Sequence, residues 1–123
     1  MSHPELVGRR VLVVEDELLV ALLVEDMLSD VGCIVVGPFS RVRDAVVAAN
    51  TLTLDIALLD VNVAGEMVFP VAHALEARGV PFLFVTGYGQ AVLPKDRPDW
   101  EACPKPFQIE QLTRLLARKL QTR

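Results

Sequence analysis

The sequence predicts an α/β fold in which a parallel β-sheet is covered by helices on both faces. Short β-branched apolar runs alternate with longer segments of helical periodicity. The runs are apolar at consecutive positions, as in strands that are buried on both faces. With 123 residues, 52% of them hydrophobic, the chain is long enough for one such doubly wound domain.

The first half of the chain contains three predicted strands and two predicted helices. The strands are expected over residues 11–14, 33–36 and 55–59. A helix is expected over 16–31, with Gly32 as its C-terminal cap. Ser40 can cap a second helix that runs to about residue 50.

The next part of the chain continues this alternation. A helix is expected over 66–78, with Pro70 in its first turn, and a strand over 81–85. A last amphipathic helix is expected over 107–121, with apolar residues on one side.

One segment, residues 87–106, breaks the alternation. It contains four prolines, and Pro94 and Pro98 are incompatible with a regular helix interior. The fourth helix is therefore expected to be short, distorted or missing, before a brief fifth strand over 101–103.

Composition and charge narrow the function classes. A formal net charge of -4 argues against direct nucleic-acid binding, which usually requires a basic face. No apolar run approaches the ~18 residues of a membrane span, and no signal peptide is visible. Cys33 and Cys103 match no metal-ligand spacing and are expected to be reduced thiols. These features predict a cytoplasmic protein that binds no membrane.

Polar side chains follow four of the predicted strands. Glu15 and Asp16 follow the first, Asp60 the third, Thr86 the fourth, and Lys105 comes shortly after the fifth. Because parallel strands end at one edge of a sheet, these residues are expected to converge there. Each alone also has an ordinary explanation, such as a helix cap for Asp16 or a turn residue for Asp60.

The combination of these side chains indicates phosphoryl transfer. Adjacent carboxylates repel one another unless a cation offsets their charge, and oxygen ligands suit Mg²⁺. A lysine and a hydroxyl suit a phosphoryl oxyanion, and a carboxylate can act as the nucleophile that forms an acyl phosphate.

Four motifs in order, VLVVEDE, LLDVN, FVTG and CPKPF, resemble the receiver domain of bacterial two-component response regulators. The resemblance extends from Arg10 to the last helix. It implies a flavodoxin-like sheet of strand order 2-1-3-4-5 and one receiver domain over 1–123, with a flexible tail over 1–8 and no output domain.

The resemblance also implies a role for each matching residue. Asp60 would accept a phosphoryl group from a sensor histidine kinase, a histidine phosphotransfer protein or a small donor. Asp16 would bind Mg²⁺ directly, Glu15 would act through water, and Asn62 would contribute its main-chain carbonyl.

The matches at FVTG and CPKPF imply a phosphate-binding and switch region. Thr86, Gly87 and Lys105 would contact the phosphoryl oxygens, and Thr86 would move toward them on activation. The Lys105–Pro106 peptide would be cis, as is common in the family.

Several positions depart from the family pattern. Ala64-Gly65 replaces a common Pro-Gly pair, and Ala102 replaces the aromatic switch residue, so transmission of activation is unassigned. Tyr88, two residues after Thr86, occupies a position that influences dephosphorylation. FVTGY and the proline-rich segment resemble stand-alone receivers of the FAT-GUY type.

The first helix offers a candidate partner surface. Its core face is expected to contain Val20, Leu23, Val24, Met27 and Val31. Leu18 and Leu22 fall on the opposite side, where they either pack under a loop or dock the helical domain of a kinase.

The sequence alone leaves other functions open. A Mg²⁺-dependent phosphatase would usually carry a second acid at the position of Asn62. A degenerate receiver that never accepts phosphate would act purely as an interaction module. A homodimer is also compatible with the sequence, and the downstream partner is expected to be a protein.

Overall fold

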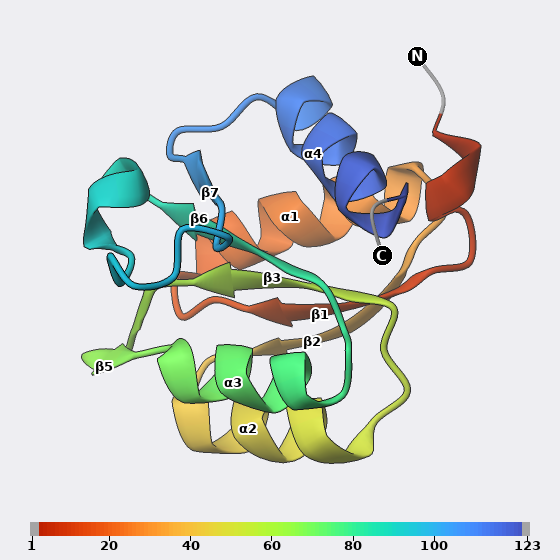
Figure 1. The fold of residues 1–123 in the computed structure, drawn as a ribbon. Helices are drawn as coiled ribbons and strands as arrows, with labels where there is room; N and C mark the ends of the chain where they lie inside the picture. Colours follow the sequence, from red (N-terminus) through yellow and green to blue (C-terminus); the bar gives the residue numbers. More distant parts are fainter. Residues whose placement is uncertain (1–2, 122–123) are drawn as a thin grey trace.

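The computed structural model describes residues 3–121, which form a parallel sheet between two layers of helices (Figure 1). Five strands make up this sheet: β1 (Arg10–Val14), β2 (Ile34–Phe39), β3 (Ile56–Asp60), β6 (Phe82–Thr86) and β7 (Ala102–Pro104). They are arranged in the order β2-β1-β3-β6-β7, with every neighbouring pair parallel. The predicted doubly wound fold and its strand order are therefore confirmed.

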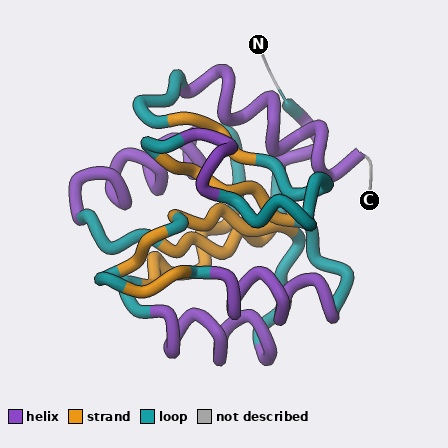
Figure 2. Tube along the Cα trace, turned by 60° about the vertical axis from the view of Figure 1, so that its left-hand side comes forward, coloured by secondary structure: helices purple, strands orange, loops and turns teal. Residues whose placement is uncertain are grey.

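Four α-helices cover the two faces of the sheet. They are α1 (Leu18–Asp30), α2 (Val42–Thr51), α3 (Phe69–Ala77) and α4 (Ile109–Gln121). Helices α1 and α4 lie on one face and α2 and α3 on the other (Figures 1 and 2). None of the helices within residues 3–121 is long and apolar enough to cross a bilayer.

The β1 sequence shows why the strands are apolar throughout. Val11 and Val13 pack into the core under α1 and α4, whereas Leu12 and Val14 pack into the core over α2 and α3. Successive side chains of a strand point to opposite faces, so a strand covered on both sides needs no polar alternation.

The helix predicted over 66–78 begins later than expected. Strands β4 (Asn62–Val63) and β5 (Glu66–Met67) form a short antiparallel hairpin instead, and α3 starts at Phe69. Ala64 and Gly65 connect the two strands with φ angles of 52° and 85°. Two central residues with positive φ match the type I′ turn, which suits a two-residue hairpin.

Two other local expectations are wrong. Ser40 does not cap α2, because the N-cap residue is Arg41 and no side chain closes the helix start. Residues 3–8 are not a free tail, because Pro4–Leu6 form the 3₁₀-helix η1 and Leu6 is fully buried against the α1 and α4 core. Residues 1 and 2 lie outside the described part of the chain.

The segment after β6 contains the irregularity predicted from its prolines. In place of a fourth α-helix it forms the 3₁₀-helix η2 (Gly89–Val92) and then two turns, closed by hydrogen bonds from the N–H of Arg97 to the carbonyl of Pro94 and from the N–H of Trp100 to the carbonyl of Arg97, before β7. Trp100 anchors this path, with its ring 5.3 Å from the ring of Phe84. Its indole N–H donates to Glu76 of α3, and the guanidinium of Arg97 stacks 4.5 Å above it.

The buried face of α1 differs from the predicted one. Val24 and Met27 are buried as expected, but the other buried members are Ala21 and Leu28. Leu23 is 47% exposed and Val20 and Val31 are only partly buried. The helix is apolar over most of its first turns, so helical periodicity could not single out its inner face.

Candidate functional site

The polar residues predicted to converge do meet at the carboxyl ends of the central strands. Asp60 ends β3 and Thr86 ends β6, and these strands are adjacent in the sheet. Lys105 follows β7, and its main-chain N–H donates to the carbonyl of Thr86 (2.8 Å). Glu15 follows β1, and its N–H donates to the carbonyl of Phe39 (2.9 Å).

Lys105 joins two carboxylates at the centre of this edge. Its ammonium nitrogen lies 3.0 Å from Glu15 Oε1 and 3.4 Å from Asp60 Oδ2. The side chains of Glu15 and Asp60 are only 5% and 11% exposed, so water screens their charges weakly. The single ammonium group offsets the repulsion between the two acids.

Burial shifts the acid–base behaviour of Asp60. Desolvation, followed by a hydrogen bond to Glu15 and the charge of Glu15, raises the pKa of Asp60 to about 7, although Lys105 acts in the opposite direction. Burial alone would lower the pKa of Lys105. The hydrogen bond to Glu15 and the charges of both acids outweigh burial, so the pKa of Lys105 lies above its ordinary value.

Three carboxylates lie close enough to share one cation. One oxygen from each of Glu15, Asp16 and Asp60 can be chosen so that all three lie within 4.8 Å of one another. Mg²⁺ prefers oxygen ligands and keeps several waters, so this donor set fits it. Burial and the neighbouring Glu15 raise the pKa of Asp60, and a bound cation would act in the opposite direction by favouring the ionised carboxylate.

The β4–β5 hairpin holds the exposed member of this set. The main-chain N–H of Ala64, at the turn, donates to Asp16 Oδ2 (2.9 Å). The side-chain carbonyl of Asn62 accepts from the N–H of Gly65 (3.1 Å), which ties the amide into the same turn. The side chain of Asn62 therefore stabilises the hairpin. Asn62 also lines the site.

An open cavity of about 610 Å³ lies directly above these groups. Its lining comes from the residues just before α1, the hairpin, the ends of β3 and β6 with the residues that follow them, η2 and the residue after β7: Asp16, Glu17, Asp60, Val61, Asn62, Met67, Thr86, Gly87, Tyr88, Val92 and Lys105.

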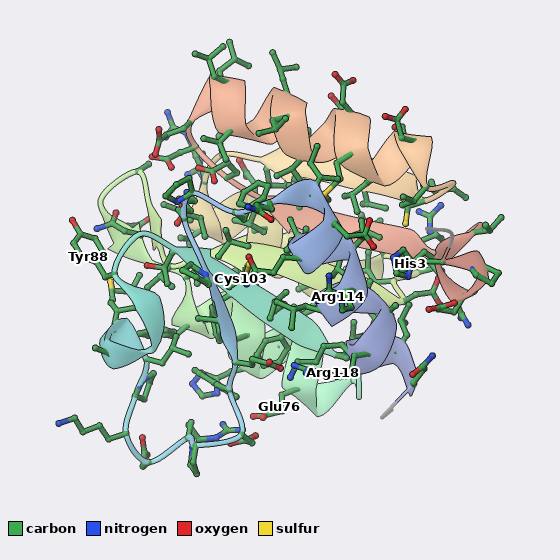
Figure 3. All side chains as sticks on the ribbon, turned by 90° about the horizontal axis from the view of Figure 1, so that it is seen from above. His3, Glu76, Tyr88, Cys103, Arg114 and Arg118 are labelled. Carbon is green, nitrogen blue, oxygen red and sulfur yellow. The ribbon has the colours of Figure 1, made fainter. Side chains whose placement is uncertain are left out.

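Thr86 and Tyr88 have opposite exposure within this lining. Thr86 is 2% exposed, and its hydroxyl oxygen accepts from the N–H of Tyr88 (3.1 Å). The Tyr88 side chain is 81% exposed and projects outward at the edge of the molecule (Figure 3). The cavity is thus deep and charged at Asp60 and shallow at Tyr88.

The remaining predicted site residues lie around this cavity. The Lys105–Pro106 peptide is cis, as the resemblance implied. Ala102 lies in β7, part-buried beside the core that contains Trp100, and does not line the cavity. Leu18 and Leu22 are 71% and 47% exposed near the start of α1, so they do not pack under a loop.

Sequence reasoning missed four residues that line the cavity, Glu17, Val61, Met67 and Val92. Met67 lines the cavity because the hairpin pairs it with Asn62. Val92 lines it as part of η2, which follows the end of β6. The Ala64-Gly65 pair between two short runs was the one available signal for the hairpin.

No protein-family model matches the sequence, and no curated protein matches it significantly. Solved structures do match it. The chain is similar to SdrG from Sphingomonas melonis Fr1, with 34% identity and a TM-score of 0.80, over 94% of this chain and 98% of that one.

Two PhyR proteins are also similar. The receiver domain of the PhyR response regulator from Erythrobacter litoralis shares 27% identity, with a TM-score of 0.82 over 94% of this chain and 92% of that one. PhyR from Brucella abortus shares 26% identity with a TM-score of 0.84, but this chain spans 51% of its length.

A further structure bears on the metal. The receiver domain of the sensor histidine kinase PA1611 from Pseudomonas aeruginosa PAO1 has the same fold, with 23% identity and a TM-score of 0.77 over 93% of this chain and 98% of that one. It holds a magnesium ion in its active-site cleft. The fold, the acidic cluster at the ends of β1 and β3, and the likeness to SdrG and the PhyR receiver domain lead to one conclusion: the chain belongs to the receiver domains of response regulators.

Proposed function

We propose that the chain takes part in phosphorelay signalling by accepting a phosphoryl group on Asp60. The observation that supports this most strongly is the placement of Lys105 between Glu15 and Asp60, at the floor of a cavity open to solvent. A carboxylate that is buried, paired with a lysine and reachable from outside has what a phosphoryl acceptor requires.

The metal belongs to the same proposal. Asp16 and Asp60, with the main-chain carbonyl of Asn62, would hold Mg²⁺, and Glu15 would contribute through bound water. When bound, Mg²⁺ supplies positive charge that neutralises the phosphoryl oxygens. Ala64 keeps the carboxylate of Asp16 aimed at this position through its main-chain N–H.

The transfer itself is a substitution at phosphorus. An oxygen of Asp60 attacks the phosphorus of a phosphohistidine, the P–N bond breaks, and its electron pair stays on the imidazole nitrogen. Lys105 then exchanges its contact with Asp60 for a contact with the phosphoryl group, and Thr86 donates its hydroxyl to another phosphoryl oxygen. The main chain at Gly87 lies beside the same cavity and completes the contact surface.

The donor would be a sensor histidine kinase or a histidine phosphotransfer protein that docks on α1. Leu18 and Leu22 are exposed close to Asp16 in the sequence, and an apolar pair there suits the side of a partner helix. A second apolar feature of α1 is a groove of about 320 Å³, which Val20 and Leu23 line together with Phe107.

The output would pass through protein contacts made by the segment after β6. Thr86 precedes this segment, and its hydroxyl oxygen accepts a hydrogen bond from the main-chain N–H of Tyr88 within it. The anti-anti-sigma factor PhyR of Bartonella quintana is 26% identical over 94% of this chain, which spans 49% of that protein, and a protein partner is the output that we propose for this chain.

Incubation with Mg²⁺ and a small phosphodonor tests the proposal, with the added mass of one phosphoryl group as the readout. Labelling of the wild type and none of Asp60→Asn is the expected result. Labelling that persists in Asp60→Asn would refute the site. Turnover of many donor molecules, far faster than the acyl phosphate decays, would identify a phosphatase. No labelling by small donors or kinases would identify a pure interaction module.

A further inference from the structure

Three aliphatic side chains line the cavity above Asp60: Val61, Met67 and Val92. Met67 is the most exposed of the three. Strand pairing places Met67 directly opposite Asn62 in the β4–β5 hairpin. Directly opposed residues of an antiparallel pair project from the same face, so Met67 lies on the same face of the hairpin as Asn62. Both line the cavity, and Met67 is 43% exposed there.

Residues from two other segments also line the cavity. Tyr88 and Val92 line it from the segment after β6, and Glu17 lines it just before α1. Unlike Glu17 and Tyr88, the side chains of Met67 and Val92 offer water no strong hydrogen-bond partner. The thioether side chain has several rotatable bonds, so it can adapt its shape to a group bound below it.

An aspartyl phosphate on Asp60 would be lost by hydrolysis from this mouth. A water oxygen attacks phosphorus in line with the bond to Asp60, and that P–O bond breaks with its electron pair left on the Asp60 carboxylate. Inorganic phosphate leaves, and the water supplies the proton that is released. The attacking water must therefore enter opposite Asp60, on the solvent side of the phosphoryl group.

From this arrangement we infer that Met67 shields the aspartyl phosphate from water and thereby lengthens its lifetime. The inference rests on the proposed phosphorylation of Asp60 and concerns its reversal. No hydrogen bond joins the Met67 side chain to Lys105 or to the carboxylates within residues 3–121, so substitution of Met67 leaves in place the groups that accept and bind the phosphoryl group.

Three substitutions separate shielding from other roles. Met67→Leu keeps the apolar volume, Met67→Ala removes most of it, and Met67→Gln introduces an amide that can hydrogen-bond a water. Val47→Ala is the matched control, since Val47 is an exposed apolar residue (61%) on α2, a helix that contributes no residue to the cavity lining.

The test follows the decay of the phosphoryl group after removal of excess small donor, with the rate of phosphorylation and the Mg²⁺ affinity measured in parallel. Met67→Ala and Met67→Gln should decay on the order of fivefold faster, because water reaches a site that was partly desolvated. Met67→Leu and Val47→Ala should decay at the wild-type rate. All variants should be phosphorylated as fast as the wild type.

Each other result has a distinct meaning. A phosphoryl group that forms normally and decays equally in all variants overturns the shielding role alone. A fall in Mg²⁺ affinity for Met67→Ala overturns it as well, because Met67 would then act by holding the hairpin and Asp16. Failure of every variant and of the wild type to take a phosphoryl group overturns the proposed function, and the inference with it.

Discussion

Lys105 contacts Glu15 more closely than it contacts Asp60, at 3.0 Å against 3.4 Å. Lys105 is thus anchored by Glu15, which would reach the metal only through water. It also remains beside Asp60, which would be phosphorylated. Glu15 is the more deeply buried of the two carboxylates, so water solvates its negative charge less and the contact with Lys105 compensates more of it.

Replacement of Lys105 by methionine should destabilise the fold at neutral pH. Two weakly solvated carboxylates would then face each other without an ammonium group, which we expect to cost about 1–3 kcal/mol in free energy of unfolding. Urea denaturation at pH 8 measures the loss. Added Mg²⁺ should restore part of it, and Lys95→Met, at an exposed lysine in the proline-rich segment, is the control. Equal stability of Lys105→Met and wild type would contradict a structural role for the ion pairs.

Asp60→Asn should make the metal-free protein more stable at pH 8. The pKa of Asp60 is raised from 3.8 to about 7, so the folded state binds the proton more tightly than the unfolded state does. The ionised carboxylate therefore opposes folding above pH 7, and this penalty disappears as the pH falls toward 4. We expect a gain of about 1–2 kcal/mol for Asp60→Asn at pH 8.

Thermal unfolding across this pH range checks the sign. The difference in Tm between Asp60→Asn and wild type should shrink steadily from pH 8 to pH 4. A constant difference would show that the substitution acts through packing and not through the charge.

The affinity for Mg²⁺ should fall as the pH is lowered through 7. Protonated Asp60 cannot ligate the ion, so protons compete with the metal below the pKa of about 7. Calorimetric titration at pH 8, 7 and 6 should give a loss approaching tenfold per pH unit below the pKa. Ca²⁺, which prefers more ligands and longer bonds, should bind more weakly under the same conditions. Affinity that is flat between pH 8 and pH 6 would remove Asp60 from the ligand set.

The parallel sheet and the convergence of Asp16, Asp60, Thr86 and Lys105 were predictable because both follow from burial of the strands, whereas the strand order was implied only by the resemblance to receiver domains. Strands that are apolar at every position must lie inside a parallel sheet, and such a sheet has one edge where ligands bind. The prolines at 94 and 98 likewise excluded a regular helix after β6. These are strong local signals that tertiary packing cannot reverse.

The hairpin and the buried Leu6 were missed because each depends on a single weak signal. Ala64 adopts a φ of 52°, which is uncommon for a residue with a Cβ, and only the Gly65 that follows it indicates a turn. Leu6 is one apolar residue in a short polar segment, and only the tertiary packing of η1 against α4 buries it. Met67 was missed with the hairpin, since its place at the cavity depends on strand pairing.

Removal of the Arg97 side chain should loosen the segment that replaces the fourth helix. Arg97 makes hydrogen bonds to Glu76 and Asp99 and stacks on Trp100, so it links this segment to α3. Arg97→Ala should lower the free energy of unfolding modestly, because water screens the ion pairs and the cation–π contact adds to them. Arg114→Ala is the control, since Arg114 is exposed and forms no ion pair within residues 3–121.

The fluorescence of Trp100, which is the only tryptophan, gives a local readout of the same change. Its emission should shift to longer wavelength in Arg97→Ala as water reaches the indole, while Arg114→Ala leaves it in place. An unshifted spectrum in Arg97→Ala would mean that aromatic packing on Phe84 alone fixes the segment.

Leu18→Ser combined with Leu22→Ser should slow phosphorylation by a protein donor and leave phosphorylation by a small donor unchanged. Both leucines are exposed on α1, outside the cavity, so their loss affects docking and not the chemistry at Asp60. We expect a decrease of roughly tenfold in kcat/KM for the protein donor, since each leucine that is buried at an interface contributes on the order of 1 kcal/mol. Ile34→Ser, at an equally exposed residue (47%) on β2, is the matched control. If the double variant slowed both donors alike, α1 would be disturbed as a whole, and if it slowed neither, the kinase would dock elsewhere.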